Sequence, residues 1–195
     1  MATEKVYSHV PEAEKMIQGL CAAYKDVMWQ VNPDVVAVLG IENKKRSKKN
    51  LVMAKIIPIK GVEKAIMQLN NVNTRYVIEV YWSDWNEWKQ NLKQWIILHE
   101  LLHISHDIGR TIKHDCEDFK IIIDKVGVNW LKCENLPDLI NGKIDFDLEL
   151  RPGLEDEDEK GEDEKDEIED TKEEKPKSDK DIKDSKEDKF NPKEE

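Results

Sequence analysis

The spacing of apolar residues along the chain predicts a series of helices and strands in its first 150 residues. Apolar positions recur at helical intervals from Pro11 to about Gln30, and the runs 35–39 and 51–59 are rich in β-forming residues. The segment 62–69 predicts a short helix. The strongest strand signal is 75–82, where β-branched and aromatic residues predominate. These elements predict an α+β fold with a small sheet.

From about residue 84 onward, the spacing of apolar residues is mainly helical. Apolar residues recur at three- and four-residue steps over about 84–108, which predicts one long helix that ends near Gly109. The segment 114–126 predicts another helix, and 128–139 predicts a less regular closing segment. The predicted strand 75–82 directly precedes the helix predicted over about 84–108.

Composition divides the chain into two parts. The segment 151–195 has 21 acidic and 11 basic residues, a net charge of −10, whereas the whole chain has a net charge of −11. All six tryptophans lie within residues 1–150, which is ample apolar material for a core. We expect a folded domain over 1–150 and a disordered acidic tail over 151–195.

The cysteines and the N-terminus bear on the cellular compartment. Cys21, Cys116 and Cys133 are an odd number without a Cys-x-x-Cys pair, which fits a reducing environment. The first residues contain no apolar core of a signal peptide, and no apolar run approaches the roughly 20 residues that span a bilayer. These features predict a soluble, cytoplasmic protein that does not bind membranes.

The stretch from Trp95 to His106 carries the chemistry. His99 and His103 are four residues apart, so on a helix both imidazoles lie on one face, close enough to bind a single Zn²⁺. Glu100 follows the first histidine and projects elsewhere, where a carboxylate can deprotonate a water molecule. A His pair at this spacing also occurs by chance. However, four of the five histidines lie within 16 residues here, which favours a metal site.

Several residues can supply the third ligand. His114 is the first candidate, because it follows the predicted stop at Gly109 and can fold back onto the helix. His106 is a rival, but it lies far along the same straight helix. Glu117 or Asp118 would give a site with two histidines and a carboxylate, and Cys116 is a further alternative. Carboxylates that could orient a ligating imidazole are Asp107, Asp115 and Asp118.

The run Lys44–Lys49 carries five positive charges in six residues. Such a run could contact nucleic-acid phosphates, but no aromatic residues are interleaved to stack on bases. A solvated loop between two strands is the favoured explanation, because exposed hairpin loops are often this basic for solubility alone. We do not assign nucleic acid as a principal partner.

The site sequence resembles a known family. His-Glu-Leu-Leu-His-Ile, preceded by a Tyr-Val-Ile-Glu-Val strand and followed by Lys-His-Asp-Cys-Glu-Asp-Phe, resembles the phage metallopeptidases over roughly 10–140. That family in turn is similar to SprT-like and Wss1-like proteases, although Phe119 follows His114 by five residues where the SprT-like pattern has four. The resemblance implies a zincin-like domain of a phage or prophage protein, with His99, His103 and His114 as ligands. By analogy with zinc peptidases, in which a strand just ahead of the metal helix is the edge strand that pairs with a substrate backbone, we expect 75–82 to lie at the sheet edge.

The resulting hypothesis is a zinc-dependent metallopeptidase that hydrolyses peptide bonds of a peptide or protein substrate, with Glu100 as general base. The alternative is a zinc-stabilised, non-catalytic module that binds a host protein or DNA. A fully protein-ligated ion would favour the alternative, and an open coordination position would favour the enzyme. Substrate specificity and oligomeric state do not follow from the sequence.

Overall fold

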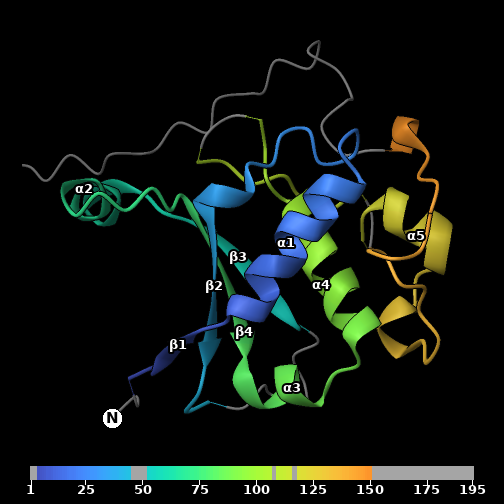
Figure 1. Ribbon diagram of the computed structural model, residues 1–195, viewed down its shortest axis with the longest axis horizontal. Helices are drawn as coiled ribbons and strands as arrows, with labels where there is room; N and C mark the ends of the chain where they lie inside the picture. Colours follow the sequence, from blue (N-terminus) through green and yellow to red (C-terminus); the bar gives the residue numbers. More distant parts are fainter. Residues whose placement is uncertain (1–3, 45–51, 107–108, 116–117, 151–195) are drawn as a thin grey trace, which may run out of the picture. The chain divides into compact units, whose positions relative to one another are not determined.

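A computed structural model describes residues 4–44, 52–106, 109–115 and 118–150. The expected acidic tail (151–195) and nearly all of the basic run (from residue 45 onward) lie outside these ranges, so both remain predictions. The described segments form one compact unit. It is an α+β domain with one small sheet, as the apolar pattern predicts (Figure 1).

The sheet contains four strands in the order β1-β2-β4-β3, namely β1 (Tyr7–His9), β2 (Val36–Ile41), β4 (Tyr76–Tyr81) and β3 (Ala54–Pro58). β2 and β4 are parallel, and both outer pairings are antiparallel. The expectation that 75–82 forms the sheet edge is wrong. β4 buries Tyr76, Ile78 and Val80 on one face and lies between β2 and β3, so the sheet edge beside it is β3, where Pro58 ends the strand.

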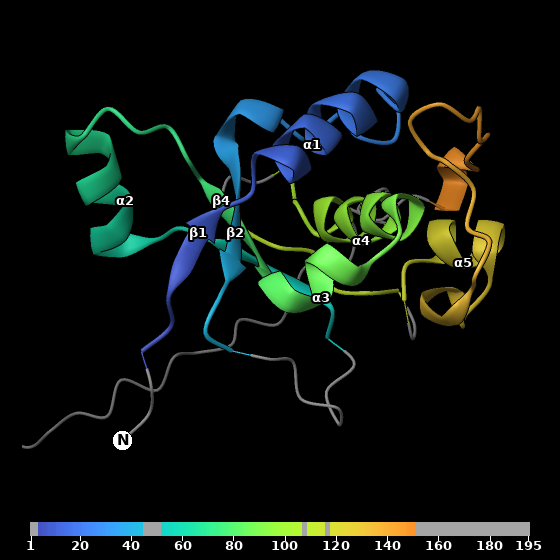
Figure 2. The ribbon, with the colours of Figure 1, turned by 60° about the horizontal axis from the view of Figure 1, so that its bottom comes forward.

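Two helices cover one face of the sheet, α1 (Pro11–Ala23) and α4 (Gln90–Leu102). They pack against each other as well as against the strands (Figures 1 and 2). The core between these layers is aliphatic and aromatic, and its fully buried members include Ile17, Leu20, Ile78, Trp95, Ile97, Leu98 and Leu101. This packing fixes α4, and therefore its histidines, against the sheet.

The remaining elements are short. α2 (Gly61–Leu69) stands clear of the sheet in both views and has no buried residue. Three 3₁₀ turns, at Pro33–Val35, Trp130–Lys132 and Leu148–Leu150, join the larger elements. α5 (Lys120–Val126) follows the site and buries Ile121 and Ile122.

The predicted helix over 84–108 is divided in the structure. α3 (Trp82–Glu87) and α4 are separated by Trp88 and Lys89, whose ψ angles of 142° and 149° are extended. The break allows Trp85 to be almost fully buried, with Trp88 packed edge-on against it at 6.1 Å between ring centroids. The periodic pattern continued through the break because both helices turn their apolar sides to the same core.

The end of α4 also differs from the prediction. The helix ends at Leu102, and the chain then reverses so that Ile104 and Thr111 form an isolated antiparallel bridge. Gly109, with φ of 85°, belongs to this turn and does not terminate a helix. The reversal carries His114 back beside α4 in a segment outside any helix or strand, six residues before α5, so the expectation that His114 opens a helix is wrong.

Candidate metal centre

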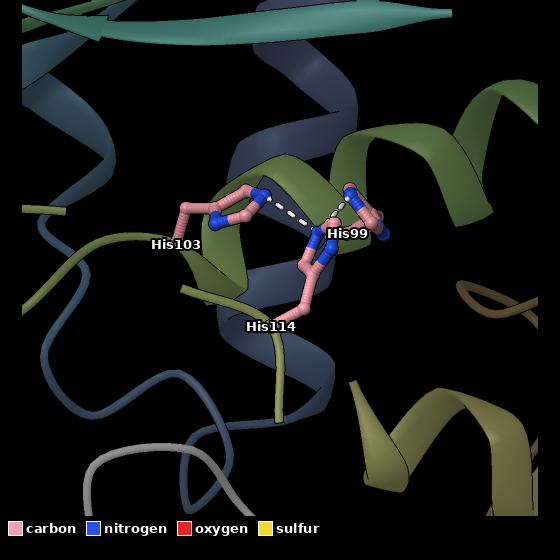
Figure 3. Close-up of side chains that lie close together, drawn as sticks. All are labelled: His99, His103 and His114. Carbon is pink, nitrogen blue, oxygen red and sulfur yellow. Dashed lines mark hydrogen bonds between the residues drawn. The ribbon is translucent and has the colours of Figure 1, made fainter. Parts of the chain in front are cut away.

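Three imidazoles converge at the C-terminal end of α4. The Nε2 atom of His114 lies 3.1 Å from Nε2 of His99 and 3.2 Å from Nε2 of His103 (Figure 3). Three nitrogens bound at about 2.0–2.1 Å to one tetrahedral zinc ion are about 3.3 Å apart. The two distances from His114 therefore suit a shared metal ion, and the ligand nitrogens of all three histidines lie within 4.8 Å of one another.

The local backbone explains the convergence. His99 and His103 are one helical turn apart, and His103 keeps helical backbone angles although it caps α4. His114 comes from the returning chain, which is held in place because the Ile112 N–H donates to the His103 carbonyl at 2.7 Å. Phe119, which is fully buried, packs edge-on against all three imidazoles.

In two of the imidazoles, those of His99 and His103, the Nδ1 atom lies close to a hydrogen-bond acceptor. His103 Nδ1 lies 2.6 Å from the Ile112 carbonyl oxygen, so Nδ1 carries the proton and donates it. His99 Nδ1 is buried and lies 2.9 Å from Asp118 Oδ1, at ion-pair distance but without the alignment of a straight hydrogen bond. Both contacts favour the tautomer whose free lone pair is on Nε2, which is the atom that faces the other histidines.

Asp118 contacts His99 at Nδ1, the ring nitrogen that does not face the other two histidines. It is 8% exposed, and its carboxylate accepts hydrogen bonds from the Trp130 indole Nε1–H and the Phe119 N–H, both at 2.7 Å. Burial acts to raise the Asp118 pKa, but the contacts with His99, Trp130 and the Phe119 N–H outweigh it, so the pKa is lowered. This position matches the predicted role of Asp118 in orienting an imidazole.

The other candidate residues lie elsewhere. His106 stacks on the Trp29 ring at 6.3 Å between centroids and is not grouped with the three histidines. Asp115 accepts from the Lys120 N–H at the start of α5, so it caps that helix. Three further candidates, Asp107, Cys116 and Glu117, lie outside the described residues.

Two of the three imidazoles, His103 and His114, have lowered pKa values. Burial lowers the His103 pKa to about 4, and burial together with nearby His99 also lowers the pKa of His114. Only a neutral imidazole has a lone pair for a metal ion. At neutral pH these two side chains are therefore ready to act as ligands without first losing a proton.

Glu100 occupies a different environment. Its side chain is 5% exposed, and Oε2 accepts a hydrogen bond from the Ile56 N–H of β3 at 2.7 Å. Burial raises the Glu100 pKa, although the charge of His99 and the Ile56 hydrogen bond partly oppose the shift. A carboxylate whose pKa is moved toward neutrality is suited to accept and return a proton.

Sequence reasoning did not identify two supporting residues. These residues are Trp130, whose indole N–H donates to Asp118, and Ile56, whose backbone N–H donates to Glu100. Neither residue has a local signal, because Trp130 lies 12 residues from Asp118 and Ile56 lies 44 residues from Glu100.

A helical His-x-x-x-His pair completed by a third histidine from the returning chain defines an α+β protein with a metal-binding site. The chain belongs to a phage metallopeptidase family, since the family described as "Putative phage metallopeptidase" matches residues 5–141. This confirms the family resemblance, while the similarity to SprT-like and Wss1-like proteases stays a prediction. No curated protein and no solved structure matches the chain.

Each helix in the described segments is too short or too polar to span a bilayer.

Proposed function

We propose that this chain is a zinc-dependent metallopeptidase that hydrolyses peptide bonds in a peptide or protein substrate. The convergence of three Nε2 atoms from His99, His103 and His114, at separations that suit one tetrahedral ion, carries the proposal. Membership of the metallopeptidase family supports it. Zinc is favoured among metals because neutral imidazoles suit it and because its catalytic sites commonly use three protein ligands.

Each side chain has a separate role in this proposal. His99, His103 and His114 hold the ion, and bound zinc would supply Lewis-acid activation of water and of the peptide carbonyl. Asp118 and the Ile112 carbonyl orient two of the imidazoles through Nδ1. Glu100 takes the proton of the attacking water and then gives it to the leaving amine, for which its raised pKa is suited.

The ligand count distinguishes this function from a zinc-stabilised binding module. Structural zinc sites are usually closed by four protein ligands, whereas catalytic sites have three and keep one position open. Among the residues whose positions are described, His99, His103 and His114 form the one group of three or more metal donors. This favours an open position and therefore catalysis.

The test combines zinc content with hydrolysis of a mixed peptide library, both followed on the purified full-length chain by mass spectrometry. We expect one zinc per wild-type chain and loss of zinc in His114→Ala. Glu100→Gln keeps a side chain of the same size, so it should retain zinc while hydrolysis falls below detection. If wild type and Glu100→Gln both hold zinc and hydrolyse the peptide library equally well, the proposed role of Glu100 is refuted. Stoichiometric zinc without any hydrolysis would favour the binding module.

A further inference from the structure

The carboxylate of Glu100 is bonded to the backbone of the sheet. Glu100 lies on α4, and its Oε2 accepts the Ile56 N–H of β3 at 2.7 Å. β3 packs against α4, and Figure 3 shows a strand passing over the helix that carries His99 and His103. The contact joins two elements 44 residues apart, directly beside the metal centre.

The Ile56 N–H is available for this bond because β3 is an edge strand. β3 pairs with β4 on one side only, and Ile56 is opposite Ile78 in that pairing. N–H groups alternate in direction along an antiparallel strand. Since the Ile56 N–H points to Glu100, the N–H groups of Lys55 and Ile57 point to β4. The bond to Glu100 therefore uses an N–H that faces away from β4, and the hydrogen bonds between β3 and β4 are unaffected.

Because Glu100 is buried, this hydrogen bond is stronger than the same bond would be at the surface. Glu100 is 5% exposed, so little water can solvate its charge. A buried carboxylate needs hydrogen bonds, and a bond from an amide to a charged oxygen is stronger than one between neutral groups. A side chain held at Oε2 also loses the freedom to turn its carboxylate in place.

We propose that the backbone N–H of Ile56 is the positioning group for Glu100, and this inference rests on the proposed peptidase function. The amide fixes Oε2 against the sheet edge, which holds the carboxylate in one orientation. Oε1 is then the oxygen that exchanges the proton. The edge strand thus acts on the chemistry through Glu100, and Ile56 itself does not touch the substrate.

The first test needs no activity. Amide hydrogen exchange at Ile56 is followed by NMR in the wild-type chain, Glu100→Gln and Glu100→Ala. We expect protection in wild type and in Glu100→Gln, whose amide oxygen can still accept, and exchange about 100-fold faster in Glu100→Ala, as expected for an amide that has lost its partner. The Ile57 amide, which faces β4, is the internal control and should stay protected in all three.

Two outcomes of the exchange experiment would overturn the inference. One is an Ile56 amide that exchanges equally fast in wild type and in Glu100→Ala while Ile57 remains protected. If Glu100→Ala unfolds and exposes Ile57 as well, Glu100→Asp replaces it, because the shorter side chain keeps the charge but does not reach the strand. Unchanged protection of Ile56 in Glu100→Asp is the second contrary outcome.

The second test separates positioning from stability. Ile56→Pro removes the N–H, and an edge strand tolerates proline where the N–H points away from its neighbour. Ile56→Ala is the matched control, since it loses the same buried side chain but keeps the N–H. With fluorescein-labelled casein as substrate, we expect kcat of Ile56→Pro to be at least about tenfold below that of Ile56→Ala, an effect typical of losing a catalytic orientation, with equal KM and zinc content.

The activity results distinguish the two proposals. Equal kcat in Ile56→Pro and Ile56→Ala, in an enzyme whose wild type cleaves casein, would overturn the positioning role and leave the peptidase function standing. A zinc-loaded wild type that cleaves neither casein nor the peptide library would overturn the peptidase function, and the positioning role would fall with it.

Discussion

The replacement Asp118→Asn tests how the buried carboxylate supports the metal centre. In the wild-type chain, the Asp118 oxygens face three donors, namely His99 Nδ1–H, the Phe119 N–H and the Trp130 indole N–H. An asparagine in the same place has one oxygen and one NH₂ group. At least one of the donors must then face another donor, and the negative charge behind His99 is lost.

The magnitude follows from burial. Asp118 is 8% exposed, so water can do little to replace a lost acceptor. Leaving one buried donor without a partner costs about 1–3 kcal/mol of folding stability. Loss of a carboxylate that orients a metal-bound imidazole typically weakens metal affinity by about 10–100-fold. We expect both effects in Asp118→Asn, and we expect the loss of zinc affinity to be the more specific one.

Zinc affinity is measured by competition with a chromophoric chelator, and stability by thermal unfolding of the zinc-free chain. Asp115→Asn is the control, because the Asp115 carboxylate accepts the Lys120 N–H and an asparagine amide oxygen can accept the same hydrogen bond. Its zinc affinity should stay within about twofold of wild type, as expected away from the supporting contacts. An Asp118→Asn chain that binds zinc as tightly as Asp115→Asn would refute the reasoning.

Three further outcomes can be checked. Trp130→Phe removes the indole donor to Asp118 and part of a buried ring but leaves the carboxylate in place, so zinc affinity should fall by less than in Asp118→Asn, in the same chelator assay. In the zinc-free chain the folded-state pKa of His103 is about 4, below the usual 6.5, so the unfolded chain binds more protons between these values. Stability should therefore fall as pH falls from 6.5 to 4, and thermal unfolding of His103→Gln should show a smaller decrease. Gly40→Ala would place a Cβ 2.5 Å from the Trp82 ring, which should cost about 1–3 kcal/mol in urea unfolding.

The sequence predicted those parts of the molecule that depend on short-range periodicity. The His99 and His103 pair needs only one helical turn, and β4 needs only a run of β-branched and aromatic residues. The α+β class followed from these elements, and the fold agrees with it. The position of His114 beside the pair also agrees with its selection as first candidate, although the chain reaches it by a bridge and a turn and not by a second helix.

The misplaced features depend on long-range contacts. β4 has the composition of a buried strand, but whether a strand is central or at the edge depends on which partners it finds, and β3 and β2 flank it in the fold. The break at Trp88 is similar, because it serves the burial of Trp85 and leaves the apolar period unchanged. Periodicity shows which side of an element is buried, but it does not show what that side packs against.

Glu100 and Asp118 are two buried carboxyl groups whose surroundings suit them to different roles. Both are almost fully buried beside His99, yet the Glu100 pKa is raised by burial, whereas the Asp118 pKa is lowered because its hydrogen bonds and the charge of His99 outweigh burial. Two carboxyl groups whose pKa values are moved apart by their surroundings have separate roles. The lowered pKa of Asp118 keeps its carboxylate charged beside His99 Nδ1, as its proposed role in orienting that imidazole requires. Glu100 has a raised pKa and accepts the Ile56 N–H on one oxygen, and this environment supports its proposed role as general base independently of the sequence motif.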